Sequence, residues 1–352
     1  MPARTVPPVR HRGSVRACHA QSRAPSVTGM RIVVIGATGH IGTFLVPRLV
    51  RAGHDVVTVT RGSSTPYADS PEWQQVERVT ADREQEDRDG TFGDRIAALR
   101  ADAVVDLVCF TMSSAEALVT ALRGSGTHLV HCGSIWRAGV SHVLPVTEEN
   151  ATEPFGDYGV QKDAIARMLK HETAEGGLLT TSLHPGHISG PGWMPIGPLG
   201  NLDPTVWTKL SAGEPVEVPG LGAETMAHVH ADDVAQAFQL AVEHRDAAAG
   251  EDFFVTAPTA LTARGSAHLV ASWFGQEARL EPVSWDRFRE TTVPEHAGAS
   301  WEHLSRSQVF STEKPRRLLG YEPAWTAEAT VLDAFRWLVE HGEVDVARPL
   351  VV

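Results

Sequence analysis

The stretch RIVVIGATGHIG, residues 31–42, decides the fold class of this chain. Arg31–Ile35 is a short apolar run typical of a buried parallel strand, and apolar residues recur at helical spacing from Ile41 onward. The three glycines of the stretch permit a tight turn and a close approach of the backbone to a ligand, and free N–H groups at a helix start favour an anion such as a pyrophosphate. A glycine pattern alone also fits a simple turn. The order of strand, turn and helix, however, predicts a dinucleotide-binding domain.

Beyond this motif, short apolar runs alternate with helical stretches, as expected for parallel strands joined by crossover helices. The expected strands are Arg31–Ile35, Asp55–Thr60, Ala103–Cys109, His128–Cys132 and Leu179–His184. The expected helices lie near residues 41–52, 91–100, 114–123 and 158–172. Right-handed crossovers then give an α/β fold of Rossmann type, with a doubly wound parallel sheet.

The texture of the sequence changes after residue 187, where the run GPGWMP at residues 190–195 signals turns. The expected parts are a dinucleotide-binding Rossmann domain at 30–187 with returning segments near 226–257, and a smaller, less regular C-terminal substrate lobe at 188–225 and 258–345. Residues 1–29 are rich in Arg, Pro and Ser and lack an apolar signal segment. We expect a disordered extension or an overlong start there, with a transit-like peptide as the alternative.

Composition narrows the class of protein. The 352 residues are 42% hydrophobic and 21% charged, as in a folded globular protein, and contain no run of 18 uncharged apolar residues. The formal net charge is −12, and residues 1–29 carry five Arg and no acid, so the remaining chain stands at −12 − 5 = −17. Such a body repels nucleic acid and anionic membranes. Cys18, Cys109 and Cys132 show no C-x-x-C spacing, so we expect a cytoplasmic protein without a disulfide framework.

Selectivity for the adenosine ribose is expected at the end of the second strand, where an acidic residue would favour NAD. Thr60 and Arg61 stand there instead. A guanidinium suits a 2′-phosphate by charge and by its bidentate geometry, so NADP is the preferred cofactor and NAD the other choice. Arg61 could also stack on adenine or point into solvent. Asp82 is placed to accept from the adenine amino group, although a surface aspartate fits the sequence nearly as well.

Tyr158 and Lys162 are four residues apart on an expected helix, which puts both on one face. A phenol with a pKa near 10 is a poor general base at neutral pH, and a neighbouring ammonium lowers that pKa by favouring phenolate. Ser134 follows the strand that ends at Cys132, at the edge where open α/β sheets bind ligands. We predict that Ser134 holds a substrate oxygen, while a loop serine in a turn with Gly133 is the alternative. Alone, the Tyr-x-x-x-Lys spacing also arises by chance in helices.

Together these motifs resemble the extended short-chain dehydrogenases/reductases, often called NAD(P)-dependent epimerases/dehydratases, from Met30 almost to the end of the chain. GATGHIG is similar to the family's glycine loop, Asp82-Arg83 to its adenine-contacting pair, and Ser134 with Tyr158 and Lys162 to its catalytic triad. Further similar segments are residues 183–192, which in the family carry nicotinamide and substrate contacts, residues 228–235 and residues 313–323.

The resemblance implies hydride transfer between nicotinamide and a carbon that bears oxygen in a sugar-like or other small carbinol, with Tyr158 handling the hydroxyl proton. It implies cofactor contacts from Gly36, Thr38, Gly39, His40, Ile41, Gly42, Thr60, Arg61, Asp82, Arg83, Val108, Lys162, Pro185 and Ile188. The candidate substrate walls are Trp136, His187, Trp193 and Met194. By analogy with the family, a homodimer is expected through the helices near 114–123 and 158–172.

Departures from the family pattern narrow the reaction. Ile135 and Trp136 follow Ser134 in place of the Asp-Glu pair of 4,6-dehydratases, so dehydration is not expected. Gly186 stands roughly where sugar-nucleotide epimerases often carry an Asn, which puts a UDP-sugar in doubt. A nucleotide-sugar epimerase with retained NAD is the first alternative, and a non-catalytic cofactor-sensing or RNA-binding relative is the second.

Metal chemistry is a further alternative, because two histidines two residues apart on a strand share one face. The residues concerned are His228, His230, Asp232 and Asp233. We expect no metal there, because one of the two aspartates should cap the helix that follows.

Overall fold

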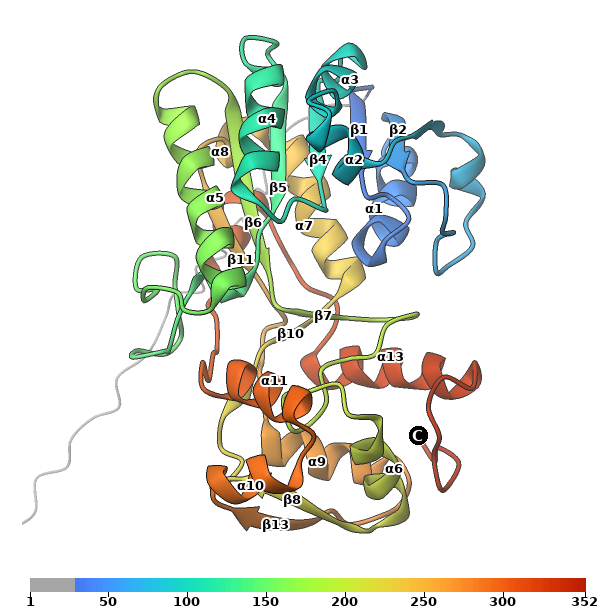
Figure 1. The fold of residues 1–352 in the computed structure, drawn as a ribbon. Coiled ribbons are helices and arrows are strands. Elements are labelled where there is room, and N and C mark those ends of the chain that lie inside the picture. Colours follow the sequence, from blue (N-terminus) through green and yellow to red (C-terminus); the bar gives the residue numbers. More distant parts are fainter. Residues whose placement is uncertain (1–28) are drawn as a thin grey trace, which may run out of the picture.

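The computed structural model describes residues 29–352. The prediction of a disordered extension therefore lies, apart from Gly29, outside the described residues. Figure 1 shows two parts: the main sheet with its helices forms the upper part, and a lobe of shorter elements lies below it. The strands β7 and β10 lie at the junction between the two parts (Figure 1).

The main sheet has seven strands, all parallel, in the order β11-β6-β5-β4-β1-β2-β3. Its strands are β1 (Arg31–Ile35), β2 (Asp55–Thr60), β3 (Glu77–Thr80), β4 (Ala103–Asp106), β5 (His128–Cys132), β6 (Leu179–Pro185) and β11 (Asp252–Val255). The strand order reverses beside β1, which is the arrangement of a doubly wound Rossmann-type fold. The predicted fold class is therefore confirmed.

Helices cover both faces of this sheet, as the alternation of apolar residues along β1 requires. Ile32 and Val34 pack in one core with α1 and α7, whereas Val33 and Ile35 pack in a second core with α3, α4 and α5. The helices of this part are α1 (His40–Arg51), α2 (Arg83–Arg88), α3 (Phe92–Ala98), α4 (Met112–Leu122), α5 (Asp157–Ala174), α7 (Ala231–Glu243), α8 (Arg245–Ala248) and α12 (Glu313–Leu319), with the 3-10 turns η1 (Pro71–Gln74) and η2 (Ile135–Arg137).

The strand β11 completes the sheet from the segment near 226–257, which the sequence indicated only as returning to this domain. Two other details of the sheet differ from the expectation. The strand expected over Ala103–Cys109 ends at Asp106, because the carboxylate of Asp106 accepts from the backbone N–H of Val108 at 3.2 Å and turns the chain. The strand β3 was not expected as an element. It reads Glu-Arg-Val-Thr and lies at the sheet edge, paired only with β2, so it carries no continuous apolar run.

The lobe has its own core, in which Trp207 stacks on Phe335 with ring centroids 4.5 Å apart. Its strands are β8 (Pro215–Pro219), β9 (Thr225–Met226), β12 (Leu261–Thr262) and β13 (Arg279–Val283), while β7 (His187–Ser189) and β10 (His228–His230) pair with each other at the junction. Its helices are α6 (Pro204–Ala212), α9 (Ala263–Ser272), α10 (Trp285–Thr291), α11 (Pro294–Leu304) and α13 (Ala327–Glu340). Among the described residues, none of the helices combines the length and the apolar character that a membrane crossing requires.

Candidate active site

The turn between β1 and α1, together with the start of α1, requires glycine at two positions. Gly36 has a φ of +82°, a conformation that side chains rarely adopt, and a Cβ atom there would lie 2.6 Å from a methyl group of Val108. A Cβ atom on Gly42 would collide with the backbone carbonyl of Ala37. The helix α1 begins at His40, so its free N–H groups face the turn. No side chain of these two residues therefore covers the backbone of the turn and of the start of α1.

A cavity of about 490 Å³ opens beside this turn. Its wall includes Gly36, Thr38, Gly39, Thr60, Arg61, Asp82, Arg83 and Val108 among the residues that the sequence predicted. The hydroxyl of Thr38 lies 2.9 Å from that of Ser64, which also lines the cavity. The side chain of Arg61 is exposed, and within residues 29–352 no carboxylate forms an ion pair with it. An unpaired guanidinium at the cavity wall can receive an anionic group.

Asp82 and Arg83 line the cavity in different ways. The carboxylate of Asp82 caps α2 by accepting from the backbone N–H of Gln85 at 3.1 Å. The guanidinium of Arg83 forms an ion pair with the buried Asp106 at 2.5 Å. The charge of Arg83 is therefore already compensated, whereas that of Arg61 is not.

Tyr158 lies in the first turn of α5, and its residue surface is 42% exposed. Despite that exposure, desolvation raises the pKa of its hydroxyl to about 12, and the nearby hydroxyl of Ser134 opposes the rise. The prediction that the ammonium of Lys162 lowers this pKa is therefore wrong for this structure, in which desolvation is the largest effect and raises it. The hydroxyl is protonated at neutral pH.

Lys162 lies one helical turn after Tyr158 and is almost completely buried. Its ammonium donates to the backbone carbonyls of Cys109 at 2.7 Å and Cys132 at 2.8 Å. Desolvation lowers the pKa of Lys162. The nitrogen lies 5.7 Å from the ring centre of Tyr158 and 4.9 Å from that of Phe110. The side chain thus links the carboxyl ends of two neighbouring chain segments, after β4 and at the end of β5, to the tyrosine on α5.

The surroundings of Tyr158 are aromatic. The indole of Trp136 meets the ring of Tyr158 edge-on at 5.7 Å and the imidazole of His303 at 4.9 Å. The ring centroids of His187 and His303 lie 4.9 Å apart. The guanidinium of Arg306 packs 4.1 Å from the centre of the Trp136 ring. Two of the four candidate substrate walls, Trp136 and His187, therefore belong to one aromatic cluster beside the tyrosine.

The other two candidate walls lie elsewhere. Trp193 packs on His40 with ring centroids 4.6 Å apart, and its indole N–H donates to the hydroxyl of Tyr67 at 2.9 Å. It therefore lies next to the glycine turn and not in the cluster with Trp136. Met194 packs against the core of the lobe.

The remaining predicted cofactor residues lie outside the wall of the cavity. They are His40, Ile41, Gly42, Lys162, Pro185 and Ile188. The first three open α1, and burial lowers the pKa of His40 to about 4. Pro185 ends β6 and Ile188 lies in β7, on the way from the main sheet into the lobe. The cavity thus covers the adenosine end of the expected cofactor site.

The histidines and aspartates considered as a metal site have other partners. His230, and neither aspartate, caps α7: its Nδ1 accepts from the backbone N–H of Asp232 at 3.0 Å. Asp232 forms a bidentate ion pair with Arg48, and Asp233 accepts from two backbone N–H groups after residue 323. His228 lies near Ser189 at 3.4 Å.

Another group of possible metal ligands lies near the cavity. Donor atoms of Asp106, Cys109 and His131 lie within 4.8 Å of one another. The ion pair of Arg83 with Asp106 and the nearby ammonium of Lys162 place two cations beside them. This arrangement opposes a bound cation, so we assign no metal to it.

Sequence reasoning missed Ser64, His303 and Arg306. Ser64 closely follows Arg61 in the sequence, so the end of the second strand was a usable signal for it. His303 and Arg306 come from α11 and the turn after it, more than a hundred residues from Trp136. No local pattern links them to the site.

The chain is similar in sequence to a family of enzymes that use nicotinamide cofactors. The profile described as the NAD dependent epimerase/dehydratase family matches residues 32–256. The 2'-dehydrokanamycin reductase of Streptomyces kanamyceticus is 30% identical over 213 residues, which cover 60% of this chain and 58% of that protein. The chain thus matches less than two thirds of the reductase's length.

Two further proteins match over most of their length. The chloroplast stem-loop binding protein of 41 kDa b from Arabidopsis thaliana is 26% identical over 330 residues, 87% of this chain and 78% of that protein. The structure of epimerase Mth375 from Methanothermobacter thermautotrophicus matches with a TM-score of 0.69 and 19% identity, over 90% of this chain and 94% of that one. At this identity the structural likeness shows the fold.

Proposed function

Because the chain belongs to the NAD-dependent epimerase/dehydratase family, as its resemblance to the extended short-chain dehydrogenases/reductases predicts, we propose that it is an NADP(H)-preferring oxidoreductase. It acts on a hydroxyl or carbonyl carbon of a sugar-like or other small carbinol. The observation that carries this proposal is the joint presence of two parts: a glycine turn with its cavity, and Tyr158 beside Ser134 and Lys162.

The cofactor fits the residues that are present. The turn at Gly36 has no room for a Cβ atom, and the wall of the cavity carries an unpaired guanidinium on Arg61. When bound, NADP(H) supplies or accepts the hydride. Arg61 would bind the 2′-phosphate, and Lys162 would bind the nicotinamide ribose. The compensated charge of Arg83 supports Arg61 as the selectivity residue.

The protonated hydroxyl of Tyr158 is suited to act as the acid in the reduction of a carbonyl. Since its pKa is raised to about 12, the hydroxyl carries a proton at neutral pH and can donate it to the oxygen of a carbonyl substrate. Ser134 would hold the same oxygen. The Streptomyces reductase, named for 2'-dehydrokanamycin, supports a sugar-like ketone as the substrate class. Trp136 and His187 would form the wall against which such a ring packs.

The test is turnover of NADPH with a panel of sugar-like ketones, compared between the natural chain and Tyr158→Phe. We expect the variant to keep its NADPH affinity and to lose turnover by roughly a hundredfold or more, as when a positioned acid is removed. Tyr321→Phe is the matched control, because the Tyr321 hydroxyl is buried against the carbonyl of Thr256. Near-normal turnover in Tyr158→Phe would rule out the proposed mechanism.

Two other functions have specific support. The family's epimerases support an epimerase with retained NAD, and cofactor that stays bound through purification would favour that alternative. The similarity to the stem-loop binding protein supports a non-catalytic RNA-binding role. The net charge of −12 argues against RNA binding. Binding of RNA that persists at about 0.2 M salt, together with no turnover of any ketone, would contradict the oxidoreductase proposal and favour the RNA-binding role.

The proposal also covers the oligomeric state of the protein and the roles of its two parts. A homodimer through α4 and α5 in the cytoplasm is proposed by analogy with the family. The lobe at 188–225 and 258–345 would carry the substrate contacts. Light scattering of the purified protein measures its oligomeric state directly.

A further inference from the structure

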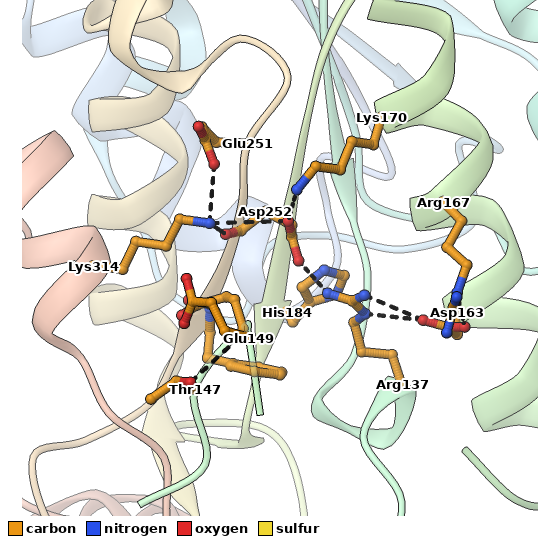
Figure 2. Close-up of polar contacts among 12 residues, drawn as sticks. Arg137, Thr147, Glu149, Asp163, Arg167, Lys170, His184, Glu251, Asp252 and Lys314 are labelled. Atoms are coloured by element: carbon orange, nitrogen blue, oxygen red, sulfur yellow. Dashed lines mark hydrogen bonds and ion pairs between the residues drawn. The ribbon is translucent and has the colours of Figure 1, made fainter. Parts of the chain in front are cut away.

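A network of buried charges lies directly behind the segment that carries Ser134. Arg137, the last residue of η2, extends toward α5 on one side and toward β11 on the other (Figure 2). Its guanidinium contacts Asp163 at 3.2 Å and forms an ion pair with Asp252. The exposed fractions of these three side chains are only 12%, 8% and 9%. Arg137 is therefore the bridge between two nearly buried carboxylates.

Each of the two carboxylates is also held by other cations. Asp163 accepts from Arg167 at 2.6 Å, and Asp252 accepts from Lys170 at 3.0 Å (Figure 2). Burial alone would raise the pKa of Asp252, but His184, Arg137 and Lys314 hold it well below its usual range. Since both acids keep a partner without Arg137, loss of the bridge removes a link between elements without leaving an isolated buried charge.

The two ends of this bridge adjoin the catalytic side chains. Asp163 directly follows Lys162 on α5. Asp252 lies on β11, which pairs with β6, and His184 of β6 accepts from the backbone N–H of Ser134 at 3.3 Å. The guanidinium therefore connects β11, which pairs with the strand whose His184 accepts from Ser134, to the helix that holds Lys162.

The segment between Ser134 and Arg137 is short and is closed by hydrogen bonds between its own residues. The backbone N–H of Arg137 donates to the carbonyl of Ser134 at 3.1 Å, and that of Trp136 donates to the Ser134 hydroxyl at 3.2 Å. Gly133 permits this arrangement, because a Cβ atom there would collide with the ring of His184. A displacement of the arginine side chain would thus be transmitted to the serine hydroxyl.

We propose that Arg137 is a positioning residue, which sets Ser134 and Trp136 against Tyr158 and Lys162 by joining Asp163 to Asp252. This role rests on the proposed function, because it serves the same hydroxyl and tyrosine. Arg137 acts only through other residues. Its removal should therefore affect the chemical step and leave the adenosine end of the site, which is formed by other elements, unchanged.

The activity test compares Arg137→Met, Arg137→Lys and Arg167→Met. Arg167→Met is the matched control, because Arg167 contacts the same Asp163 but is 61% exposed and does not reach η2. Arg137→Met should lower kcat by roughly a hundredfold, the cost of a small misplacement of reacting groups, and keep NADPH affinity within about twofold. The deuterium isotope effect from C4-labelled NADPH should rise. Arg137→Lys should recover part of the lost kcat, and the control Arg167→Met should keep the kcat of the natural chain.

Hydrogen exchange measured by mass spectrometry on the same proteins gives a second readout that needs no turnover. Peptides covering residues 133–139 should exchange faster in Arg137→Met than in Arg167→Met, while those covering 31–42 should not change. Unchanged exchange at 133–139, or equal losses of kcat in both methionine variants, would overturn the positioning role. A different result separates the two proposals: if the natural chain itself turns over no ketone, but residues 133–139 still exchange faster in Arg137→Met, the proposed function is rejected. The role of Arg137 in holding this segment then stands.

Discussion

Substitution of His128 by glutamine should reduce the acid sensitivity of the fold. His128 opens β5, is almost completely buried, and lies at the opposite end of that strand from Ser134. Its Nε2 lies 2.9 Å from the hydroxyl of Thr181, and Nδ1 has no partner among the described residues. Desolvation, assisted by Arg245, lowers its pKa from 6.5 to about 4. Protonating this imidazole therefore favours the unfolded chain.

The sign and the size of the effect follow from these two pKa values. Well above pH 6.5 the imidazole is neutral in both states and contributes almost no pH dependence. As the pH falls toward about 4, the unfolded chain binds a proton that the folded protein does not, so the free energy of unfolding decreases. Between about pH 7.5 and pH 5, this one residue should cost about 2 kcal/mol.

The measurement is urea denaturation of the natural chain and His128→Gln at about pH 7.5 and at about pH 5, without cofactor. At the higher pH, the difference in unfolding free energy between the variant and the natural chain reflects only the altered contact with Thr181. At the lower pH the difference in unfolding free energy should shift by about 2 kcal/mol in favour of the variant. The variant should remain acid-sensitive in part, since burial also lowers the pKa of His40 and of His228 to about 4. An unchanged difference at the two pH values would refute the reasoning.

Two further substitutions test the cofactor site. Arg61→Ala should weaken NADPH binding by roughly tenfold to a hundredfold, the value of a charge-assisted hydrogen bond, with little effect on NADH; calorimetry with both cofactors measures this, and an equal effect on both would reject NADP selectivity. Gly36→Ala should impair binding of both cofactors, because a Cβ atom would lie 2.6 Å from Val108 at a φ of +82°; unchanged affinity would show that the turn does not contact the diphosphate.

Much of the main sheet was predictable because several of its strands contain short clusters of apolar and β-branched residues. The strands at Arg31–Ile35, Asp55–Thr60 and His128–Cys132 have the bounds that the sequence predicts. The edge strand β3 was not predictable, because its pairing with β2 supplies what its polar sequence does not indicate. Tertiary pairing overrides local propensity there.

The site shows the same division. The four-residue spacing of Tyr158 and Lys162 placed them on one helix face, which the structure shows. The direction of the tyrosine pKa shift could not be predicted, because it depends on how many groups from distant segments exclude water around the hydroxyl. For the same reason, the neighbours that α11 brings to Trp136 had no signal in the sequence.

The place of β11 at the end of the main sheet bears on how this protein can fold and be dissected. The strand β6 has one of its two edges covered only by Asp252–Val255, which are synthesised some seventy residues later. During translation, that edge stays without its partner until the first segment of the lobe, residues 188–225, and the helices α7 and α8 have emerged from the ribosome. A fragment that stops at residue 187 would expose the open edge to other chains, so excising the nucleotide-binding half alone should yield aggregates in place of a working module.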